Sequence, residues 1–360
     1  MSELDELRRR IDRVDEELVR LLAERARLAQ EIGRLKEGQE VYAPAREEAV
    51  YEHVEKANPG PLPAGALRAI FREIMSATKA LQKKTVVAHF GPAGTFTHLA
   101  ALRHFGHSVE YLGLEDIGAV FAAVERGRAD YAVVPIENST EGGVNQTLDM
   151  FLESTLRICN ELYLPVHQHL MAARDGLPLE DIRRVYSHPQ ALAQCRRFLA
   201  TTLPHAEVRE TASTVEAALR ARQEADAAAL ASEAASELYG LAIIRRSVED
   251  STSNITRFFV LARHHSPPTG NDKTTILVSI KDEVGALLHL LEPFYQAGLN
   301  LTRIESRPSR RRAWDYVFFI DFEGHAENDR VKKVLEEVRR HCSYLVVLGS
   351  YPKAEPAPAD

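Results

Sequence analysis

A single arginine interrupts an apolar heptad seam near the start of the chain. Leu, Ile and Val recur at alternating spacings of three and four from Leu4 to Leu35, and Arg25 occupies the seam position between Leu21 and Leu28. Two interpretations stay open: the guanidinium leaves the seam or pairs with a glutamate, or it faces an anion. The anion site is favoured by further polar residues that could line the same pocket: Lys36, Arg46, Glu47 and Gln82.

Arg8 lies on the same predicted helix, but 17 residues before Arg25, which is about 25 Å along the axis. It cannot share a pocket with Arg25 of its own chain unless the helix bends sharply. A helix over residues 3–36 would be about 50 Å long, too long to bury its seam against two shorter helices. A second chain is therefore the expected partner, and antiparallel pairing would bring the partner's Arg8 towards Arg25.

Polar loops follow several predicted strands in the middle of the chain. Each loop alone is typical of a helix cap or a turn, but strand ends in α/β sheets form clefts. Gly91 and Gly94 fit neither a dinucleotide fingerprint nor a P-loop. The loop residues that could line a cleft are Thr95, Thr97, Asn138, Ser139, Thr140, Ser187, His188, Gln190, Thr256 and Arg257.

These residues must be positioned by three kinds of element. Residues 1–84 are helical throughout and predict one long helix and two shorter ones. Residues 85–263 alternate β-rich and helical runs, which predicts an α/β domain with a largely parallel sheet. Residues 272–351 follow the order βαββαβ of a ferredoxin-like α+β module. The Pro/Ala-rich residues 352–360 predict a disordered tail.

Composition excludes several classes of function. The 360 residues carry a net charge of −7 with interspersed basic residues, which argues against a nucleic-acid partner. No apolar run is long enough for a membrane span, and the charged N-terminus lacks a signal-peptide core, so the expected location is the cytoplasm. The three cysteines indicate neither a disulfide framework nor a zinc site. His167 and His169 could form a metal pair, but no third ligand is evident, and no metal is expected.

The segments "LRRRID", "LLAERARLAQEIGRLK", "VYAPAREE" and "IFREIMSATKALQ" resemble the all-helical type of chorismate mutase, an intertwined dimer. The resemblance implies that Arg25 and the partner's Arg8 bind the two substrate carboxylates. It further implies roles for Lys36 and Gln82 at the ether oxygen, for Glu47 at the ring hydroxyl, and for Arg46 and Thr78 in the wall. The pericyclic rearrangement of chorismate to prephenate needs a folded substrate and fixed donors, without an acid, base or nucleophile. Ala43 stands where the family often has an acidic residue.

The segments "GPAGTFTH", "PIENS", "SHPQ" and "TRF" together resemble prephenate dehydratase. The family fold implies two α/β lobes around a cleft, similar to a periplasmic binding protein, with the "TRFFVLA" strand returning to the first lobe. By this resemblance Thr256 is the catalytic candidate, while Asn138, Ser139, Gln190 and Arg257 position the substrate. Arg257 is suited to clamp a carboxylate, or else forms a structural pair between lobes.

The segments "EVGALLHLLEPF" and "AGLNLTRIESRPSR" resemble the ACT regulatory domain that binds phenylalanine. The alternative is a plain packing module in which Gly285 caps a helix. The resemblance implies a phenylalanine site made by Gly285, Ala286, Leu287, Asn300, Glu305, Ser306, Arg307 and Pro308.

The sequence as a whole is identified as a member of the bifunctional chorismate mutase and prephenate dehydratase family. This implies conversion of chorismate through prephenate to phenylpyruvate without a cofactor, feedback inhibition by phenylalanine, and a homodimer whose assembly into tetramers is open. Two alternatives are an arogenate-preferring dehydratase and a catalytically silent amino-acid sensor.

Overall fold

The computed structural model describes residues 2–35, 44–251, 253–280, 283–309 and 316–355. They form two compact units, one of residues 1–86 with 104–110 and the other of residues 87–103 with 111–360. Among the described helices, none combines the length and apolarity that a bilayer crossing requires.

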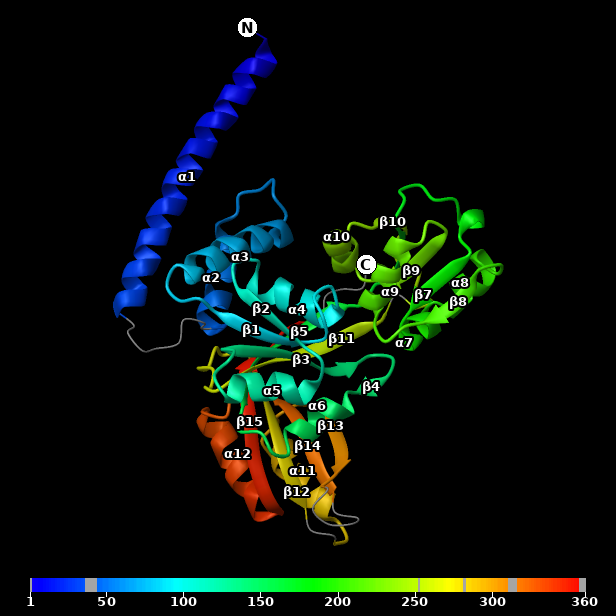
Figure 1. Ribbon diagram of the computed structural model, residues 1–360. Helices are drawn as coiled ribbons and strands as arrows, with labels where there is room; N and C mark the ends of the chain where they lie inside the picture. Colours follow the sequence, from blue (N-terminus) through cyan, green and yellow to red (C-terminus); the bar gives the residue numbers. More distant parts are fainter. Residues whose placement is uncertain (1, 36–43, 252, 281–282, 310–315, 356–360) are drawn as a thin grey trace. The chain divides into compact units, whose positions relative to one another are not determined.

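The first unit contains the predicted long helix and two shorter ones: α1 (Glu3–Leu35), α2 (Pro44–Ala57) and α3 (Ala64–Ala80). Figure 1 shows α1 as one unbroken helix, and none of its residues is buried. The heptad seam stays open, with Leu7, Val14 and Leu18 all about half exposed. The segment His104–Glu110 belongs to this unit because His107 N donates to Glu73 Oε2 (3.0 Å) in α3.

The second unit begins with an α/β lobe built on the sheet order β2-β1-β3-β11-β5, with β4 paired to β3. The strand β11 returns to this first lobe as expected. It runs antiparallel to both β3 and β5, so the sheet is mixed rather than largely parallel. The elements are β1 (Val86–Phe90), α4 (Phe96–Phe105), β2 (Glu110–Leu114), α5 (Ile117–Glu125), β3 (Tyr131–Asn138), β4 (Gly142–Gly143), α6 (Asn145–Met150), β5 (Arg157–Pro165) and β11 (Ile255–Ala262).

A second lobe has its own sheet in the order β10-β6-β9-β7-β8. The chain enters and leaves it through two adjacent crossovers, where Val166 N donates to Asn254 O and Val248 N to Gln168 O, both at 2.8 Å. The elements are β6 (His169–Ala172), the 3₁₀ turn η1 (Leu179–Asp181), β7 (Arg184–Ser187), α7 (Pro189–Gln194), α8 (Arg196–Thr202), β8 (Glu207–Glu210), α9 (Thr214–Gln223), β9 (Ala227–Ala231), α10 (Glu233–Tyr239) and β10 (Ala242–Arg245).

The last module has the predicted βαββαβ order, with the sheet β13-β14-β12-β15. Alternate residues such as Ile276 and Ile320 form a core with α11 and α12 on one face. The elements are β12 (Asp272–Ile280), α11 (Ala286–Gln296), β13 (Leu301–Pro308), β14 (Tyr316–Glu323), α12 (Asp329–Arg340) and β15 (Cys342–Pro352).

The other face of this sheet packs on the first lobe within the same unit. The rings of Tyr351 and Phe259 have centroids 5.7 Å apart, and Arg157 Nη1 donates to Val347 O at 3.0 Å. The disordered tail was predicted to begin at residue 352, which is too early. Pro352 still belongs to β15 and pairs with Asp272 of β12, and Lys353 N donates to Asn271 O.

Candidate active sites

Arg25 is held by the third helix of the first unit. Its Nη1 donates to Thr78 Oγ1 at 3.0 Å, and the Thr78 hydroxyl donates to Ile74 O at 2.8 Å. Burial lowers the pKa of Arg25 from its usual value, because the charged form loses hydration. Among the described residues, no glutamate lies within ion-pair distance of Arg25, so the interpretation as a glutamate pair finds no support there.

Glu47 forms an ion pair with Lys79, at 2.6 Å between Oε1 and Nζ. Their side chains are only 14% and 17% exposed. Burial raises the pKa of Glu47, and the neighbouring Lys79 ammonium opposes part of that shift. Lys79 was not among the predicted site residues, although it stands in the last turn of α3, three residues before Gln82, which lies just beyond the helix.

The structure gives fewer contacts for the other residues that were predicted to form the site in the helical unit. Gln82 lies against Gly33 of α1, where an added Cβ would come within 3.0 Å of Gln82 Cγ. Arg8 and Arg46 are exposed. Lys36 and Ala43 lie outside the described residues.

A cavity of about 610 Å³ is lined by both lobes of the second unit. The first lobe contributes Asn138 and Thr256, at the ends of β3 and β11, and the second contributes Gln190 from α7. Gln168 enters from a crossover. The cavity therefore lies where the predicted strand-end loops meet.

Asn138 fixes the orientation of Thr256 inside this cavity. Its amide Nδ2 donates to Thr256 Oγ1 at 2.8 Å and to Asn254 Oδ1 at 2.7 Å, which uses both amide hydrogens. Its Oδ1 accepts from the Thr140 hydroxyl (2.6 Å) and from backbone N–H groups. Since Thr256 Oγ1 accepts from Asn138, its own hydrogen remains available to donate into the cavity.

Glu141 is held by two amides of the second lobe. Gln190 Nε2 donates to Glu141 Oε2 at 2.5 Å, and Gln194 Nε2 donates to Oε1 at 3.4 Å. Gln168 Nε2 donates in turn to Gln194 Oε1 at 3.3 Å. This polarised chain leaves the buried Gln168 Oε1 without a partner at the cavity wall.

The described cavity lining includes the carboxylates Glu115 and Glu141 but neither lysine nor arginine. The donors for an anionic ligand in this lining are therefore neutral groups and His188. Thr97 of α4 and Thr214 of α9 line the cavity at the N-terminal ends of their helices, where backbone N–H groups are free of intrahelical partners.

Two predicted positioning residues point elsewhere. Ser139 Oγ donates to Ser253 O at 2.8 Å and accepts from Ile255 N at 3.0 Å, so it ties two loops together outside the cavity lining. Arg257 follows Thr256 on a strand, and alternation turns its side chain to the other face. It binds Asp321 of the βαββαβ module (Nη1 to Oδ2, 2.5 Å), and the predicted carboxylate clamp is wrong in this structure.

The predicted effector residues divide between two faces. Gly285 has a φ of +83° and caps α11, and Leu287 is partly exposed after the buried Ala286. Along β13 burial alternates, with Ser306 and Pro308 exposed and Glu305 and Arg307 turned towards the first lobe. Arg307 Nη2 binds Asp149 Oδ1 at 2.8 Å. Asn300 is exposed, and its carbonyl accepts from Glu323 N at 2.9 Å.

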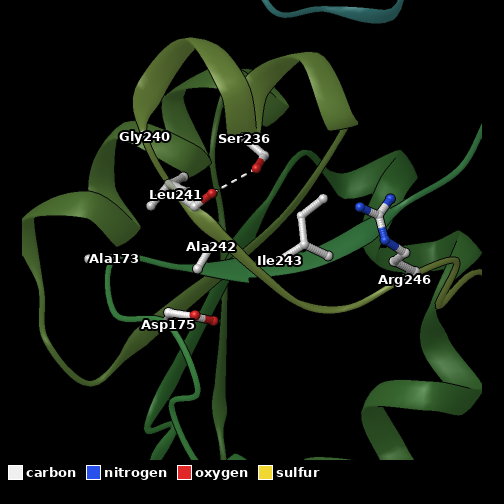
Figure 2. A pocket seen from close by; sticks show the side chains of 8 residues that line it. All are labelled: Ala173, Asp175, Ser236, Gly240, Leu241, Ala242, Ile243 and Arg246. Atoms are coloured by element: carbon white, nitrogen blue, oxygen red, sulfur yellow. Dashed lines mark hydrogen bonds between the residues drawn. The ribbon is translucent and has the colours of Figure 1, made fainter. Parts of the chain in front are cut away.

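A second hollow lies in the second lobe (Figure 2). Its cationic group, Arg246, is paired with Glu233 at 2.7 Å, and the Ser236 hydroxyl donates to Leu241 O. These polar groups are already engaged by protein, so the hollow lacks the convergent free donors of the larger cavity.

Family models match all three parts of the chain. They are chorismate mutase type II over residues 7–83, prephenate dehydratase over 87–266 and the ACT domain over 274–340. A bifunctional chorismate mutase/prephenate dehydratase from Aquifex aeolicus is 50% identical, with 98% of this chain and 99% of that protein covered. The chain belongs to the bifunctional chorismate mutase/prephenate dehydratase family.

Another family member, from Pseudomonas aeruginosa, is 45% identical over 98% of both chains. Among solved structures, prephenate dehydratase from Arthrobacter aurescens in complex with L-Phe has a TM-score of 0.69 and 36% identity. That match covers 77% of this chain and 93% of the other. Both enzymatic activities of the family, chorismate mutase and prephenate dehydratase, are therefore those of this chain.

Sequence reasoning missed Gln168, which lines the dehydratase cavity, and Asn254, which bonds the lining residue Asn138. Both are 2% exposed and lie in the crossovers between lobes. Asn254 Nδ2 and Gln168 Oε1 have no hydrogen-bond partner among the described residues, and Gln168 Oε1 lies in the cavity lining, where a ligand could satisfy it. Their only sequence signal is an amide in a predicted connection, which is typical of ordinary loops.

Proposed function

We propose that the mutase step occurs around Arg25, at a site completed by a second copy of the chain. The Arg25 guanidinium is partly buried and bonded to Thr78, so it is preorganised to bind a substrate carboxylate without a further conformational search. Gln82 donates to the ether oxygen as the C–O bond breaks. Lys36 supplies a second donor there, and Glu47 accepts from the ring hydroxyl.

The partner copy supplies Arg8. The open seam of α1 exposes apolar residues along the whole helix, and antiparallel pairing of two such seams buries them. Pairing also places the partner's Arg8 near Arg25, on the geometry of a 33-residue helix. The resulting homodimer, in the cytoplasm, is the form in which we expect the mutase to act.

The dehydratase step occurs in the cavity between the lobes. Prephenate loses its ring carboxylate as CO₂ and its ring hydroxyl as hydroxide, which takes up a proton to leave as water, and phenylpyruvate remains. Thr256 donates a hydrogen bond to the departing hydroxyl, which stabilises the charge that develops there. The Asn138–Thr256 hydrogen bond carries this assignment, because it directs the Thr256 hydrogen away from protein acceptors.

Neutral donors hold the substrate carboxylates in this cavity. Gln190 supplies an amide, and the ends of α4 and α9 supply backbone N–H groups. With neither lysine nor arginine in the described lining, the site does not overstabilise the ring carboxylate that must be lost.

Phenylalanine acts at the ACT module through β13. An added Cβ on Gly143, which lines the cavity, would lie 3.4 Å from a Glu305 carboxylate atom and 3.2 Å from Arg303 Nη2. Glu305 is one of the predicted effector residues. An effector that shifts β13 therefore acts directly on a wall of the dehydratase cavity.

The test supplies purified full-length protein with chorismate and follows chorismate loss and phenylpyruvate formation separately, with and without phenylalanine. We expect phenylpyruvate from chorismate alone and its suppression by phenylalanine. Parallel assays with prephenate and arogenate compare the two dehydratase substrates. Activity on neither chorismate nor prephenate, with retained phenylalanine binding, would instead identify an amino-acid sensor.

A further inference from the structure

Consecutive residues of β11 serve two different sides of the second unit. Thr256 faces the dehydratase cavity and pairs in register with Asn138 of β3. Arg257 pairs in register with Glu137 and faces the ACT sheet. The register of β11 on β3 shifts directly after Arg257, so the backbone here departs from a regular ladder.

The Arg257 guanidinium is fixed by three groups. Its Nε donates to Glu161 Oε2 (2.8 Å), its Nη1 to Asp321 Oδ2 (2.5 Å) and its Nη2 to the Tyr351 hydroxyl (3.1 Å). The Arg257 side chain is 5% exposed, and both carboxylates are fully buried. Burial lowers the pKa of Arg257, but Tyr351, Asp321 and Glu161 outweigh it and the net shift is upward.

Two of these three partners come from the ACT module, and they are themselves fixed. Thr275 Oγ1 donates to Asp321 Oδ1 at 2.8 Å and shares a hydrogen bond of 2.7 Å with the Tyr351 hydroxyl. Lys273 Nζ lies 3.0 Å from Glu161 Oε1, so the two buried carboxylates face two buried cations. The cluster of Arg257, Glu161, Asp321, Lys273 and Tyr351 is therefore balanced in charge and fully bonded.

A cluster of this kind is a poor device for stability alone. Desolvating four charges costs several kcal/mol per ion, and apolar side chains in the same place are often as stabilising or more so. The surrounding interface already contains aromatic rings in contact, such as Phe259 and Tyr351. What a planar, three-way bonded guanidinium adds is a fixed position and orientation.

We propose that Asp321 and Tyr351 of the ACT module are positioning residues for the dehydratase reaction, acting through Arg257 on the backbone that aims Thr256. The adjacent Cα atoms of residues 256 and 257 are about 3.8 Å apart, so a shift of one is transmitted to the other. The ACT module then forms part of the scaffold of the dehydratase site even without effector. This inference rests on the proposed role of Thr256.

The first test measures dehydratase kinetics of full-length Asp321→Asn and Tyr351→Phe. We expect kcat to fall about 10-fold to 100-fold, since misplacement by about 1 Å is enough for that loss, with little change in KM for prephenate. Mutase activity in the same samples stays unchanged. Arg157→Met is the matched control. The Arg157 side chain also donates a hydrogen bond to the ACT sheet, at Val347 O, but it is not part of the Arg257 cluster.

Arg257→Lys separates charge from geometry. Lysine keeps the positive charge but cannot bond three partners in one plane, so we expect it to behave like Asp321→Asn rather than like the native chain. Native kcat in Arg257→Lys and in Tyr351→Phe would overturn the proposal.

A double-mutant cycle with Thr256→Val separates this inference from the role of Thr256. If Asp321 acts through Thr256, adding Asp321→Asn to Thr256→Val lowers kcat by less than twofold further. Full multiplicative loss in the double variant would show a general structural effect and reject the inference while leaving Thr256 in place. Native activity of Thr256→Val alone would reject the catalytic role of Thr256 itself.

Discussion

Asn138 and Thr256 lie opposite each other on neighbouring antiparallel strands, and the amide of Asn138 donates to the hydroxyl oxygen of Thr256 at 2.8 Å. The direction of this bond decides what Thr256 can do. A hydroxyl that accepts from its neighbour has its hydrogen free for a ligand, whereas one that donates to its neighbour does not.

Reversing that bond should harm the dehydratase more than removing it. In Asn138→Asp the carboxylate would accept the Thr256 hydrogen, whereas in Asn138→Ala the hydroxyl only loses its restraint. We expect kcat for prephenate to fall on the order of 10²-fold to 10³-fold in Asn138→Asp, and less in Asn138→Ala. Steady-state assays of both variants, with mutase activity as the internal control, test this order. Equal losses would mean that the direction of the Asn138–Thr256 hydrogen bond does not matter for catalysis.

Replacing Gln82 with glutamate should give the mutase an acid-shifted pH profile. A protonated carboxyl donates to the ether oxygen as the amide does, but an ionised one repels the negative charge that develops there. The native enzyme, with its neutral amide, should show a broad profile. The measurement is kcat/KM for chorismate against pH, in Gln82→Glu and the native chain. A variant profile that matches the native one would remove Gln82 from the site.

A charge in the α1 seam should separate the two activities. Leu18 is 51% exposed in the single chain, and Leu18→Glu would place a carboxylate in the paired seam. We expect dissociation to monomers and loss of mutase activity, because the partner's Arg8 leaves the site, while dehydratase activity persists. Leu18→Met is the matched control that keeps the seam apolar. Light scattering measures the oligomeric state, and separate assays measure the mutase and dehydratase activities. A monomer with mutase activity would contradict a site shared between two chains.

The first lobe should lose stability in acid partly through His89. Burial, and then the charge of His98, lower the pKa of His89 to about 4. The unfolded chain takes up a proton near pH 6.5 while the folded chain does not. The contribution is therefore constant well above that pH and is lost as pH falls, by about 2 kcal/mol between pH 7 and pH 5. In His89→Gln, denaturation midpoints at pH 7 and pH 5 should differ less than in the native chain.

Much of the fold could be predicted from local pattern. The heptad spacing predicted α1 and its open seam, and the element order predicted the ACT module, because both signals are periodic over many residues. The parallel character of the middle sheets was overestimated. Whether β11 runs parallel or antiparallel to β3 depends on how the chain returns from the second lobe, which no local pattern encodes.

The site was predicted less completely, for two physical reasons. Arg257 was assigned to the cavity together with Thr256. Both lie in one predicted strand, where neighbouring side chains face opposite sides, so the strand prediction already argued against this assignment. Lys79 and Asn254 were missed because their partners, Glu47 and Asn138, are 32 and 116 residues away in the chain and meet them only in the folded protein.

The ACT module cannot be cut away from the dehydratase lobes without breaking buried ion pairs. Cutting the chain between residues 263 and 272 would expose the apolar sheet faces and leave Arg257 and Glu161 on one fragment, with Asp321 on the other. Arg257 would keep Glu161, but Asp321 and Lys273 on the other fragment would each lose their buried ion-pair partner. A gene that lost its sensor would thus lose a well-formed dehydratase with it, so desensitised enzymes should arise by point substitution rather than by truncation.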